Sequence, residues 1–276
     1  MNDQPTIAIS GAGSGLGEAM ARRFAQEGYR VAVTDRDADR AENVMNDIRE
    51  TGGSGFALGL DVTSDEDWEL LYDKVRSEWG RLDVLVNNAG VAGAGRLEDF
   101  GLEDWKWLMD INLMGVVRGC HRFIPMLREQ GQGHIVNVAS FAGMMPVPEL
   151  SAYATAKAAV IALSEQLRVD LAKDGVGVSV LCPAYVQTAL LDTFRSQNRN
   201  HKKTAERWMS SSPVSADDVA QVVYKGVANR TFLLLTHGET RWIWRFRRWF
   251  PRLFYRSILR AERRLSSKYA SLSSES

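Results

Sequence analysis

Apolar runs and amphipathic segments alternate along most of the chain, and this alternation restricts the possible folds more than any other feature. The apolar runs are typical of strands buried on both faces of a parallel sheet, and they read TIAIS, RVAVTD, GFALGLDV, LDVLVNNAG, GHIVNVAS and GVGVSVLCP. Helical patterns cover residues 16–28, 38–51, 65–79, 103–130 and 151–173, and a helix over 216–228 precedes a last strand, TFLLLT. We therefore expect an α/β fold with three layers, in which helices cover both faces of a doubly wound, mostly parallel sheet.

Composition and chain organisation favour a single domain without metal. No repeat or low-complexity linker interrupts residues 1–238, so we predict one domain there and a C-terminal extension over residues 239–276. Cys120, Cys182 and four scattered histidines have neither disulfide-framework nor metal-ligand spacing. The N-terminal residues lack the pattern of a secretory signal and no apolar run could span a bilayer, so a cytoplasmic location is expected.

The turn after the first predicted strand is rich in glycine. It reads SGAGSGLG and places Gly11, Gly15 and Gly17 before the first predicted helix. Glycine permits close backbone approach and a helix N-terminus attracts anions, so this turn is a candidate phosphate cradle. Asp35 ends the second predicted strand, where a carboxylate can accept hydrogen bonds from an adenosine ribose. Two plainer readings stay open, because tight turns need glycine anyway and Asp35 could be a solvated loop charge.

The segment SAYATAK, residues 151–157, holds one tyrosine and one lysine among small residues. Tyr153 and Lys157 are four positions apart, which places them on one face of a helix. Read in isolation, the pair could be a buried aromatic ring beside a snorkelling lysine.

Taken in order, these motifs resemble the short-chain dehydrogenase/reductase family over residues 5–236, which implies a Rossmann fold. The matching pieces are the glycine turn, Asp61-Val62, NNAG at 87–90, Asn112 in INLMG, Ser140 in VNVAS, Tyr153 and Lys157 in YATAK, and PAYVQT at 183–188. Two positions depart from the family pattern: Ser10 stands where threonine is common, and Ala184 follows Pro183 where glycine is common. The second change would stiffen the loop beside the nicotinamide without removing a reactive group.

The resemblance implies an NAD(P)-dependent oxidoreductase that interconverts a secondary alcohol and a ketone. Hydride transfer to or from a carbinol carbon also requires a proton to move at the oxygen, and Tyr153 would move it. A free phenol has a pKa near 10, and the ammonium of Lys157 is expected to lower that pKa while also binding the nicotinamide ribose. Ser140 would hydrogen-bond the substrate oxygen, and Asn112 would hold a water that relays protons from Lys157.

The same resemblance implies a set of cofactor-binding residues. Leu16 would border the nicotinamide, Asp61 and Val62 the adenine, and Val186 and Thr188 the carboxamide. The full set is Gly11, Ser14, Gly15, Leu16, Gly17, Asp35, Arg36, Asp61, Val62, Asn88, Ala89, Gly90, Tyr153, Lys157, Pro183, Val186 and Thr188. Asp35 should repel a 2′-phosphate and so favours NAD, but Arg36 could turn toward such a phosphate, which keeps NADP open.

Three segments beyond the strand ends are candidates for substrate specificity: residues 91–97, 141–150 and 185–213. The last two carry the apolar side chains Phe141, Met144, Met145, Val147, Leu150, Tyr185, Leu190, Leu191, Phe194, Trp208 and Met209. This lining suits a bulky hydrophobic ketone or secondary alcohol, although several of these residues could be core or subunit contacts in a homo-oligomer, a dimer or tetramer. The alternative function is a dinucleotide-binding interaction protein tethered to a membrane or partner. Intact Ser140, Tyr153 and Lys157 argue against it.

The C-terminal extension is basic and aromatic. Residues 241–276 carry ten Lys/Arg and two Glu, so the first 240 residues have a net charge of minus eight in a chain of zero net charge. Trp242, Phe246, Trp249 and Leu253 follow helical spacing, with a neighbouring stripe of arginines, and Pro251 should divide the segment into two helices. Residues 241–264 suit peripheral contact with an anionic membrane, but docking on the acidic domain or on another subunit is favoured here. Nucleic-acid binding is not expected.

Overall fold

The computed structural model describes residues 4–260. By internal contacts the chain divides into one unit that ends at Thr236 and a second that begins at His237. The first unit contains a seven-stranded sheet in the order β3-β2-β1-β4-β5-β6-β7, in which every neighbouring pair is parallel. The strands are β1 (Thr6–Ser10), β2 (Arg30–Asp35), β3 (Ser54–Gly59), β4 (Val84–Asn87), β5 (Gly133–Val138), β6 (Val176–Leu181) and β7 (Leu233–Leu234). The predicted doubly wound parallel sheet is confirmed.

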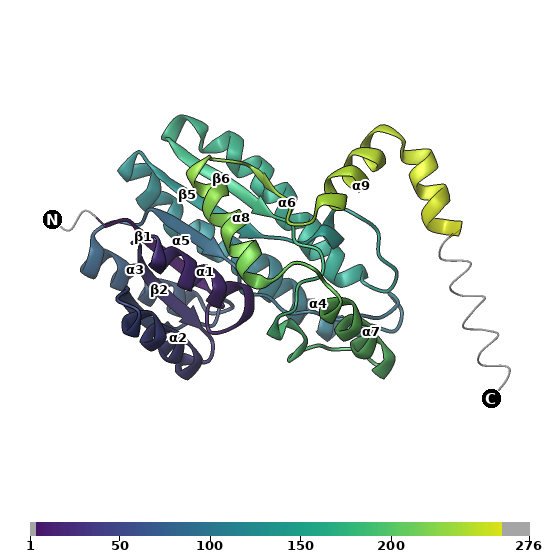
Figure 1. The fold of residues 1–276 in the computed structure, drawn as a ribbon, viewed down its shortest axis with the longest axis horizontal. Coiled ribbons are helices and arrows are strands. Elements are labelled where there is room, and N and C mark those ends of the chain that lie inside the picture. The colour runs from purple at the N-terminus through teal and green to yellow at the C-terminus, as the bar shows by residue number, and fades with distance from the viewer. Residues whose placement is uncertain (1–3, 261–276) are drawn as a thin grey trace. The chain divides into compact units, whose positions relative to one another are not determined.

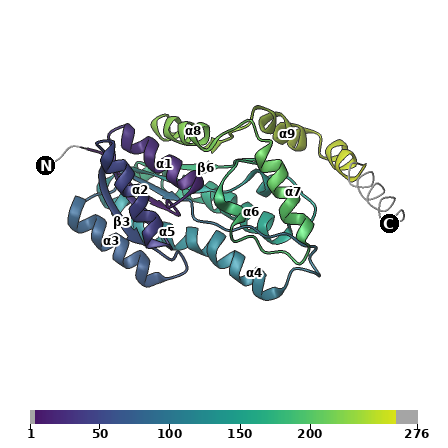
Figure 2. The ribbon, with the colours of Figure 1, turned by 60° about the horizontal axis from the view of Figure 1, so that its bottom comes forward.

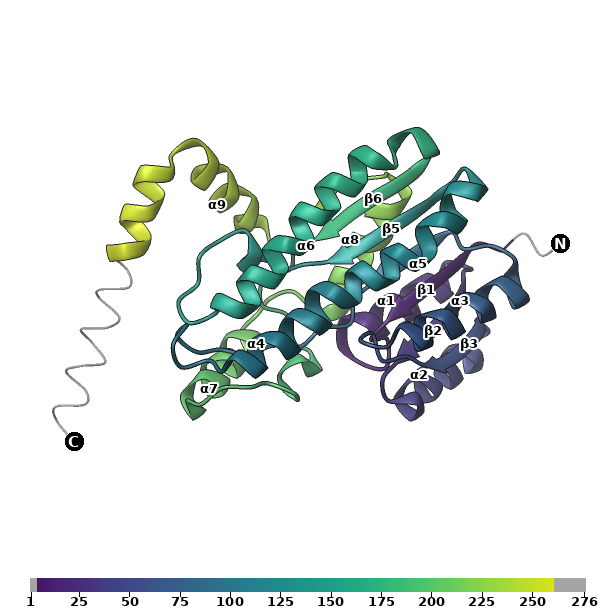
Figure 3. The same ribbon diagram turned by 180° about the vertical axis from the view of Figure 1, so that it is seen from behind.

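Helices cover both faces of this sheet. Figure 1 shows α1 (Gly15–Gln26), α2 (Ala38–Glu50) and α8 (Ala216–Ala228) in front of the sheet. Figure 3 shows α3 (Asp65–Trp79), α5 (Gly115–Gln130) and α6 (Ser151–Asp170) on the opposite face. The architecture therefore has the three layers that the alternating sequence predicted.

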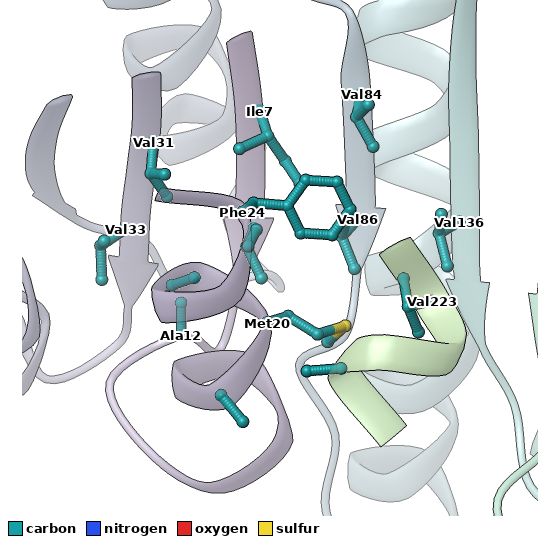
Figure 4. Close-up of a cluster of buried hydrophobic side chains, with 14 of the residues drawn as sticks. Ile7, Ala12, Met20, Phe24, Val31, Val33, Val84, Val86, Val136 and Val223 are labelled. Atoms are coloured by element: carbon teal, nitrogen blue, oxygen red, sulfur yellow. The ribbon is translucent and has the colours of Figure 1, made fainter. Parts of the chain in front are cut away.

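The core between the sheet, α1 and α8 explains why the strand sequences are continuously apolar. All five residues of β1 are buried, because helices pack on both of its faces. Figure 4 shows Phe24 and Met20 of α1 beside Ile7 of β1 and Val86 of β4, with Val223 of α8 close by. This packing fixes the start of α1 against the carboxyl end of β1, where the glycine turn lies.

The order in which successive strands are added to the sheet reverses at β1. The chain proceeds from β1 to β2 and β3 on one side, and it returns to β4 on the other side of β1. Loops that follow neighbouring strands on opposite sides of such a point diverge, which leaves a crevice at their carboxyl ends. The glycine turn and the NNAG segment follow β1 and β4, so the topology brings both to this crevice.

Two helical regions differ from the sequence prediction. The single helix predicted over 103–130 is α4 (Leu102–Met109) followed by a π-helical turn, Asp110–Met114, and then α5. Residues 189–212, for which the sequence analysis gave no helical pattern, contain a 3₁₀ turn (Ala189–Leu191) and α7 (Arg199–Ser210). Figure 2 shows α7 at the opposite end of the first unit from α2 and α3. The sequence of α7 is largely polar, and Asn198 supports its start by accepting a hydrogen bond from the amide of Asn200.

The second unit contains a helix on each side of a proline. Helix α9 (Gly238–Trp249) is followed by Phe250 at its C-cap. Residues 251–260 are helical again, and Pro251 is the first residue of that second helix. The predicted break at Pro251 is confirmed, because a proline is tolerated in the first turn of a helix but not in its interior. Residues 261–264 of the basic segment lie outside the described residues. Across residues 4–260 we find no helix with the length and apolar character needed to cross a bilayer.

The burial of His134 in β5 leads us to predict that the stability of the fold depends on pH. It is buried, its Nε2 lies 2.7 Å from the hydroxyl of Ser179, and burial lowers its pKa to about 4, with a smaller contribution from the charge of Arg230. Unfolded histidine has a pKa near 6.5, so acidification protonates the unfolded state before the folded one. Stability is therefore fully present above pH 6.5 and is lost as pH falls toward 4, by about 3 kcal/mol in total.

Denaturant unfolding at a series of pH values measures this loss. His134→Gln keeps a polar side chain beside Ser179 but does not titrate, so its free energy of unfolding should change less between pH 7 and pH 4.5 than that of the wild type. His121→Gln, at an exposed position, is the matched control and should follow the wild type. Equal pH slopes for His134→Gln and wild type would contradict the prediction.

Candidate active site

The glycines of the turn after β1 are packed too closely to accept side chains. Gly11 and Gly15 have φ values of +63° and +57°, which favour glycine. A Cβ on Gly17 would collide with the carbonyl oxygen of Gly11 and would lie 2.6 Å from Nδ2 of Asn88. Ser14 precedes α1 without a side-chain capping bond, so the first amide groups of the helix keep their capacity to bind an anion.

Asn88 fastens the glycine turn to the end of β4. Its Nδ2 donates to the carbonyl oxygens of Ser10 and Gly11, both at 2.9 Å. The backbone amides of Asn88 and Ala89 donate to the hydroxyl of Ser10 at 3.0 and 3.2 Å. Ser10 thus supplies the hydroxyl at the position where the family commonly has threonine, and the departure leaves this connection intact.

Asp35 lies directly beside the glycine turn. Its carboxylate accepts hydrogen bonds from the amides of Gly13 and Asp37, both at 3.0 Å. Arg36 is exposed. Arg40, which the sequence analysis missed, also adjoins the turn, since its Cβ would lie 2.7 Å from a Cβ on Gly13. Its position in the first turn of α2, four residues after Arg36, could have identified Arg40 as a neighbour of the glycine turn.

The residues predicted to flank the adenine lie after β3. The Asp61 carboxylate accepts from the amide and hydroxyl of Thr63 at 2.9 and 2.7 Å. Val62 is buried, and a Cβ on Gly115 at the start of α5 would lie 2.9 Å from one of its methyl carbons. These contacts fix the rim of the crevice beside the end of β3.

Asn112 occupies the π-helical turn and is completely buried. Its Oδ1 accepts from the amide of Val91 and its Nδ2 donates to the carbonyl of Val91, each at 2.8 Å. Its amide group therefore holds the segment after β4, and its role in a proton relay stays a prediction. A Cβ on Gly90 would lie 2.9 Å from Oδ1 of Asn112 and 3.4 Å from Nζ of Lys157, so glycine lets both side chains approach.

Ser140, Tyr153 and Lys157 come together at the ends of β5 and α6. The Lys157 Nζ donates to the carbonyl oxygen of Val138 at 2.9 Å and lies 5.9 Å from the ring centroid of Tyr153. The Ser140 hydroxyl accepts from the amide of Ala142 at 3.1 Å and interacts with the Tyr153 phenol, which lowers the pKa of that phenol. Lys157 is 4% exposed and Ser140 is 8% exposed, so the lysine ammonium is in a region almost free of water.

The protonation of this group differs from the sequence expectation. Burial raises the pKa of Tyr153 above its usual value, and the hydrogen bond with Ser140 opposes that rise. Burial also lowers the pKa of Lys157 to about 8. Lys157 was expected to lower the pKa of the phenol, and that effect stays a prediction, since the larger influence on Tyr153 here is the cost of removing the charged phenolate from water. The phenol is thus protonated at neutral pH.

The segment after β6 closes the remaining side of the crevice. The carbonyl of Pro183 accepts from the amide of Phe141 at 2.9 Å, and Val186 is buried against the core that Leu16 also contacts. A Cβ on Gly15 would lie 3.0 Å from the Cβ of Thr188. The structure therefore brings the residues predicted after β1, β4, β5 and β6 to the same edge of the sheet, at the carboxyl ends of its strands.

The three segments proposed for specificity are joined to each other. Parallel bridges connect Gly93 with Arg195 and Gly95 with Leu150. Glu149 has a φ of 62°, and its carboxylate lies 2.9 Å from Nε2 of His201. Sequence analysis missed Glu149 and His201, because their approach depends on the folding of two separate loops.

The apolar residues in these segments have two different environments. Tyr185 and Trp208 are 39% and 46% exposed, and their ring centroids are 5.1 Å apart. Met144, Leu191 and Met209 are buried. The Tyr185–Trp208 pair is available to a ligand. The three buried residues pack inside the protein, as expected if some of the apolar residues in these segments are core contacts.

Comparison with known proteins places this chain among oxidoreductases. The family described as short chain dehydrogenase matches residues 5–199. The probable oxidoreductase EphD of Mycobacterium tuberculosis is 39% identical over 188 residues, which are 68% of this chain and 32% of EphD. The chain thus spans about a third of that relative's length. The 3beta-hydroxysteroid dehydrogenase of Mediterraneibacter gnavus is 35% identical over 221 residues, covering 77% of this chain and 80% of the relative.

A solved structure extends the match to most of the fold. A short chain dehydrogenase/reductase from Burkholderia phymatum, crystallised in complex with NAD, superimposes with a TM-score of 0.86 at 32% identity. The match covers 91% of this chain and 95% of the other.

Proposed function

This chain belongs to the short-chain dehydrogenase family, and from that premise we propose that it uses NAD(P) to interconvert a secondary alcohol and a ketone on a bulky hydrophobic molecule. The observation that carries the proposal is the meeting of Ser140, Tyr153 and Lys157, together with a glycine turn in which Gly17 has no room for a side chain. A module that only binds a dinucleotide would need the glycine turn but not a phenol, hydroxyl and ammonium together.

The crevice fits a nicotinamide dinucleotide. The closely packed Gly17 and the side-chain-uncapped start of α1 form a cradle for phosphate groups, and Asp35 offers a carboxylate beside that cradle. Gly90 leaves open the space between Asn112 and Lys157. When bound, the cofactor supplies a nicotinamide carbon that accepts or donates a hydride.

The side chains of this protein would transfer the proton that accompanies the hydride. In the reductive direction, the Ser140 hydroxyl orients the substrate oxygen and Tyr153 donates its phenolic proton to that oxygen. The raised pKa of Tyr153 keeps it protonated at neutral pH, which supports reduction as the direction that needs no prior deprotonation. Lys157, whose pKa burial lowers to about 8, would stabilise the resulting phenolate and return a proton to it.

The available lining supports a hydrophobic substrate. Tyr185 and Trp208 present partly exposed aromatic surface near the crevice. A relative carries the name 3beta-hydroxysteroid dehydrogenase, and a steroid alcohol is a bulky apolar molecule of the class proposed here. The predicted dimer or tetramer also stays a proposal, supported by the exposed Leu97, Leu102 and Val169 on the first unit.

Nicotinamide absorbance tests the function. NADH and NADPH are each supplied with a panel of hydrophobic ketones, and with small polar ketones as the control. We expect oxidation of the reduced cofactor with at least one hydrophobic ketone and little with the polar set. Cofactor binding without turnover on any ketone would favour the dinucleotide-binding interaction protein instead.

Cofactor choice depends on the charge of Asp35. Asp35→Asn keeps a group that can accept from Gly13 but removes the negative charge, so the ratio of kcat/KM for NADPH over NADH should rise by roughly tenfold. Arg36→Ala and Arg40→Ala in the wild-type background should leave NADH kinetics nearly unchanged. Steady-state kinetics with both cofactors measures the ratio. A wild type that prefers NADPH, and loses that preference in Arg36→Ala or Arg40→Ala, would reverse the assignment to NAD.

A further inference from the structure

Helix α9 presents aromatic and cationic side chains on the same exposed side. Trp242, Phe246 and Trp249 are 69%, 41% and 75% exposed, and their spacing of four and three residues aligns them along the helix. Arg241, Arg245 and Arg248 are exposed and have the same spacing, one residue earlier. We call these six side chains the arginine–tryptophan face.

The helix over residues 251–260 repeats this pattern. Arg252, Arg256 and Arg260 are spaced by four residues and are all exposed. Leu253, Tyr255 and Leu259 are 53%, 43% and 57% exposed. Two consecutive helices thus combine exposed apolar groups with a row of arginines, which a single chance amphipathic helix would not explain.

The positive charge of this segment has almost no local compensation. Residues 237–260 contain seven arginines, and Glu239 is the one carboxylate among them. The guanidinium carbon of Arg245 lies 5.5 Å from the ring centroid of Trp242, and that of Arg248 lies 5.8 Å from the ring of Trp244. Such cation–π contacts order the arginines but leave their charge in place. The surface therefore fits a partner that is both anionic and apolar.

We propose that the arginine–tryptophan face binds the surface of an anionic lipid bilayer, with α9 lying parallel to it. Tryptophan and tyrosine favour the boundary between lipid head groups and acyl chains, while arginines beside them contact lipid phosphates. Helices of this kind lie on a bilayer without crossing it. Docking of this face on a protein surface, which the sequence analysis favoured, is the competing hypothesis, and the vesicle experiments below distinguish it from membrane binding. Symmetric pairing of two copies would bring their arginines against each other.

Co-sedimentation of the full-length protein with vesicles tests the proposal. Vesicles containing phosphatidylglycerol should bind the protein, vesicles of pure phosphatidylcholine should bind it far less, and added salt should weaken the binding. The triple variant Arg241→Gln/Arg245→Gln/Arg248→Gln should lower the partition coefficient by about a hundredfold. Trp242→Ser/Trp249→Ser should lower it as well, because the apolar contribution is removed.

Matched variants on the first unit control for general charge and hydrophobicity. Arg49→Gln/Lys74→Gln/Lys106→Gln removes three cations that are partly or largely exposed, and Leu70→Ser removes a 59% exposed apolar side chain. Both should bind the anionic vesicles like the wild type. Circular dichroism and cofactor affinity verify that the α9 variants are folded, and quenching of wild-type tryptophan fluorescence by brominated phosphatidylglycerol tests insertion without any substitution.

Three results would overturn the proposal. The first is wild-type binding that does not distinguish phosphatidylglycerol from phosphatidylcholine, or that survives both α9 variants. The second is a smaller molecular mass of the α9 variants without vesicle binding by the wild type, which would assign the face to a second copy of the chain. The third is binding of single-stranded DNA with no binding of either vesicle, which would assign it to nucleic acid.

Discussion

Replacing Tyr153 with phenylalanine is expected to lower kcat by roughly 10²–10⁴-fold, the usual range for removing a positioned proton donor. The ring and its packing beside Lys157 are retained, but the group that hydrogen-bonds Ser140 is lost. The dissociation constant for the cofactor should change little, because the phosphate cradle is formed elsewhere. Single-turnover kinetics and a fluorescence titration with reduced cofactor measure the two quantities separately.

Tyr185→Phe is the matched control for that substitution. Tyr185 is 39% exposed, and burial raises its pKa to about 12, with a contribution from Tyr153 nearby. Its ring lies beside Trp208 on the exposed surface, so removal of its hydroxyl should alter KM for hydrophobic ketones more than kcat. Loss of turnover in Tyr185→Phe together with retained turnover in Tyr153→Phe would transfer the proton-donor role to Tyr185.

The substitution Gly17→Ala should weaken cofactor binding by roughly tenfold to a hundredfold. The added methyl group would collide with the Gly11 carbonyl and lie 2.8 Å from Cα of Ala12, so the cradle itself must shift. These neighbours are backbone atoms, which cannot rotate away as a side chain can. Titration of NADH fluorescence measures the dissociation constant.

Gly101→Ala provides the comparison for this glycine. A Cβ there meets its nearest neighbour, an Asp104 carboxylate oxygen, at an ordinary 3.7 Å. That variant should bind the cofactor like the wild type and melt at a similar temperature. Wild-type affinity in Gly17→Ala would contradict the assignment of the glycine turn as the phosphate cradle.

Local sequence patterns predicted the sheet because its strands are buried on both sides. β1 shows the reason most clearly, since all five of its residues are buried between two helical layers. The glycine turn was equally predictable from the sequence, because the positive φ values at Gly11 and Gly15 favour glycine at those positions. In both cases the constraint acts on neighbouring residues and leaves a visible pattern.

Features that depend on distant contacts were not predictable in this way. The π-helical turn is held by Asn112, whose amide bonds Val91 twenty-one positions earlier. Glu149 and His201 meet through two separate loops. The pKa of Tyr153 follows from a balance between burial and neighbouring groups. The spacing of residues along a helix predicts which side chains are neighbours, but it does not predict how deeply they are buried.

The most direct test of the proposed site follows one hydrogen atom. Reduced cofactor that carries two deuterium atoms at the reactive nicotinamide carbon is incubated with the wild-type protein and a hydrophobic ketone, and the product is analysed by mass spectrometry. We expect one deuterium on the carbinol carbon of each product molecule, with roughly a hundredth or less of that amount transferred by Tyr153→Phe over the same time. Tight cofactor binding with no deuterium in any product, across the full ketone panel, would contradict it.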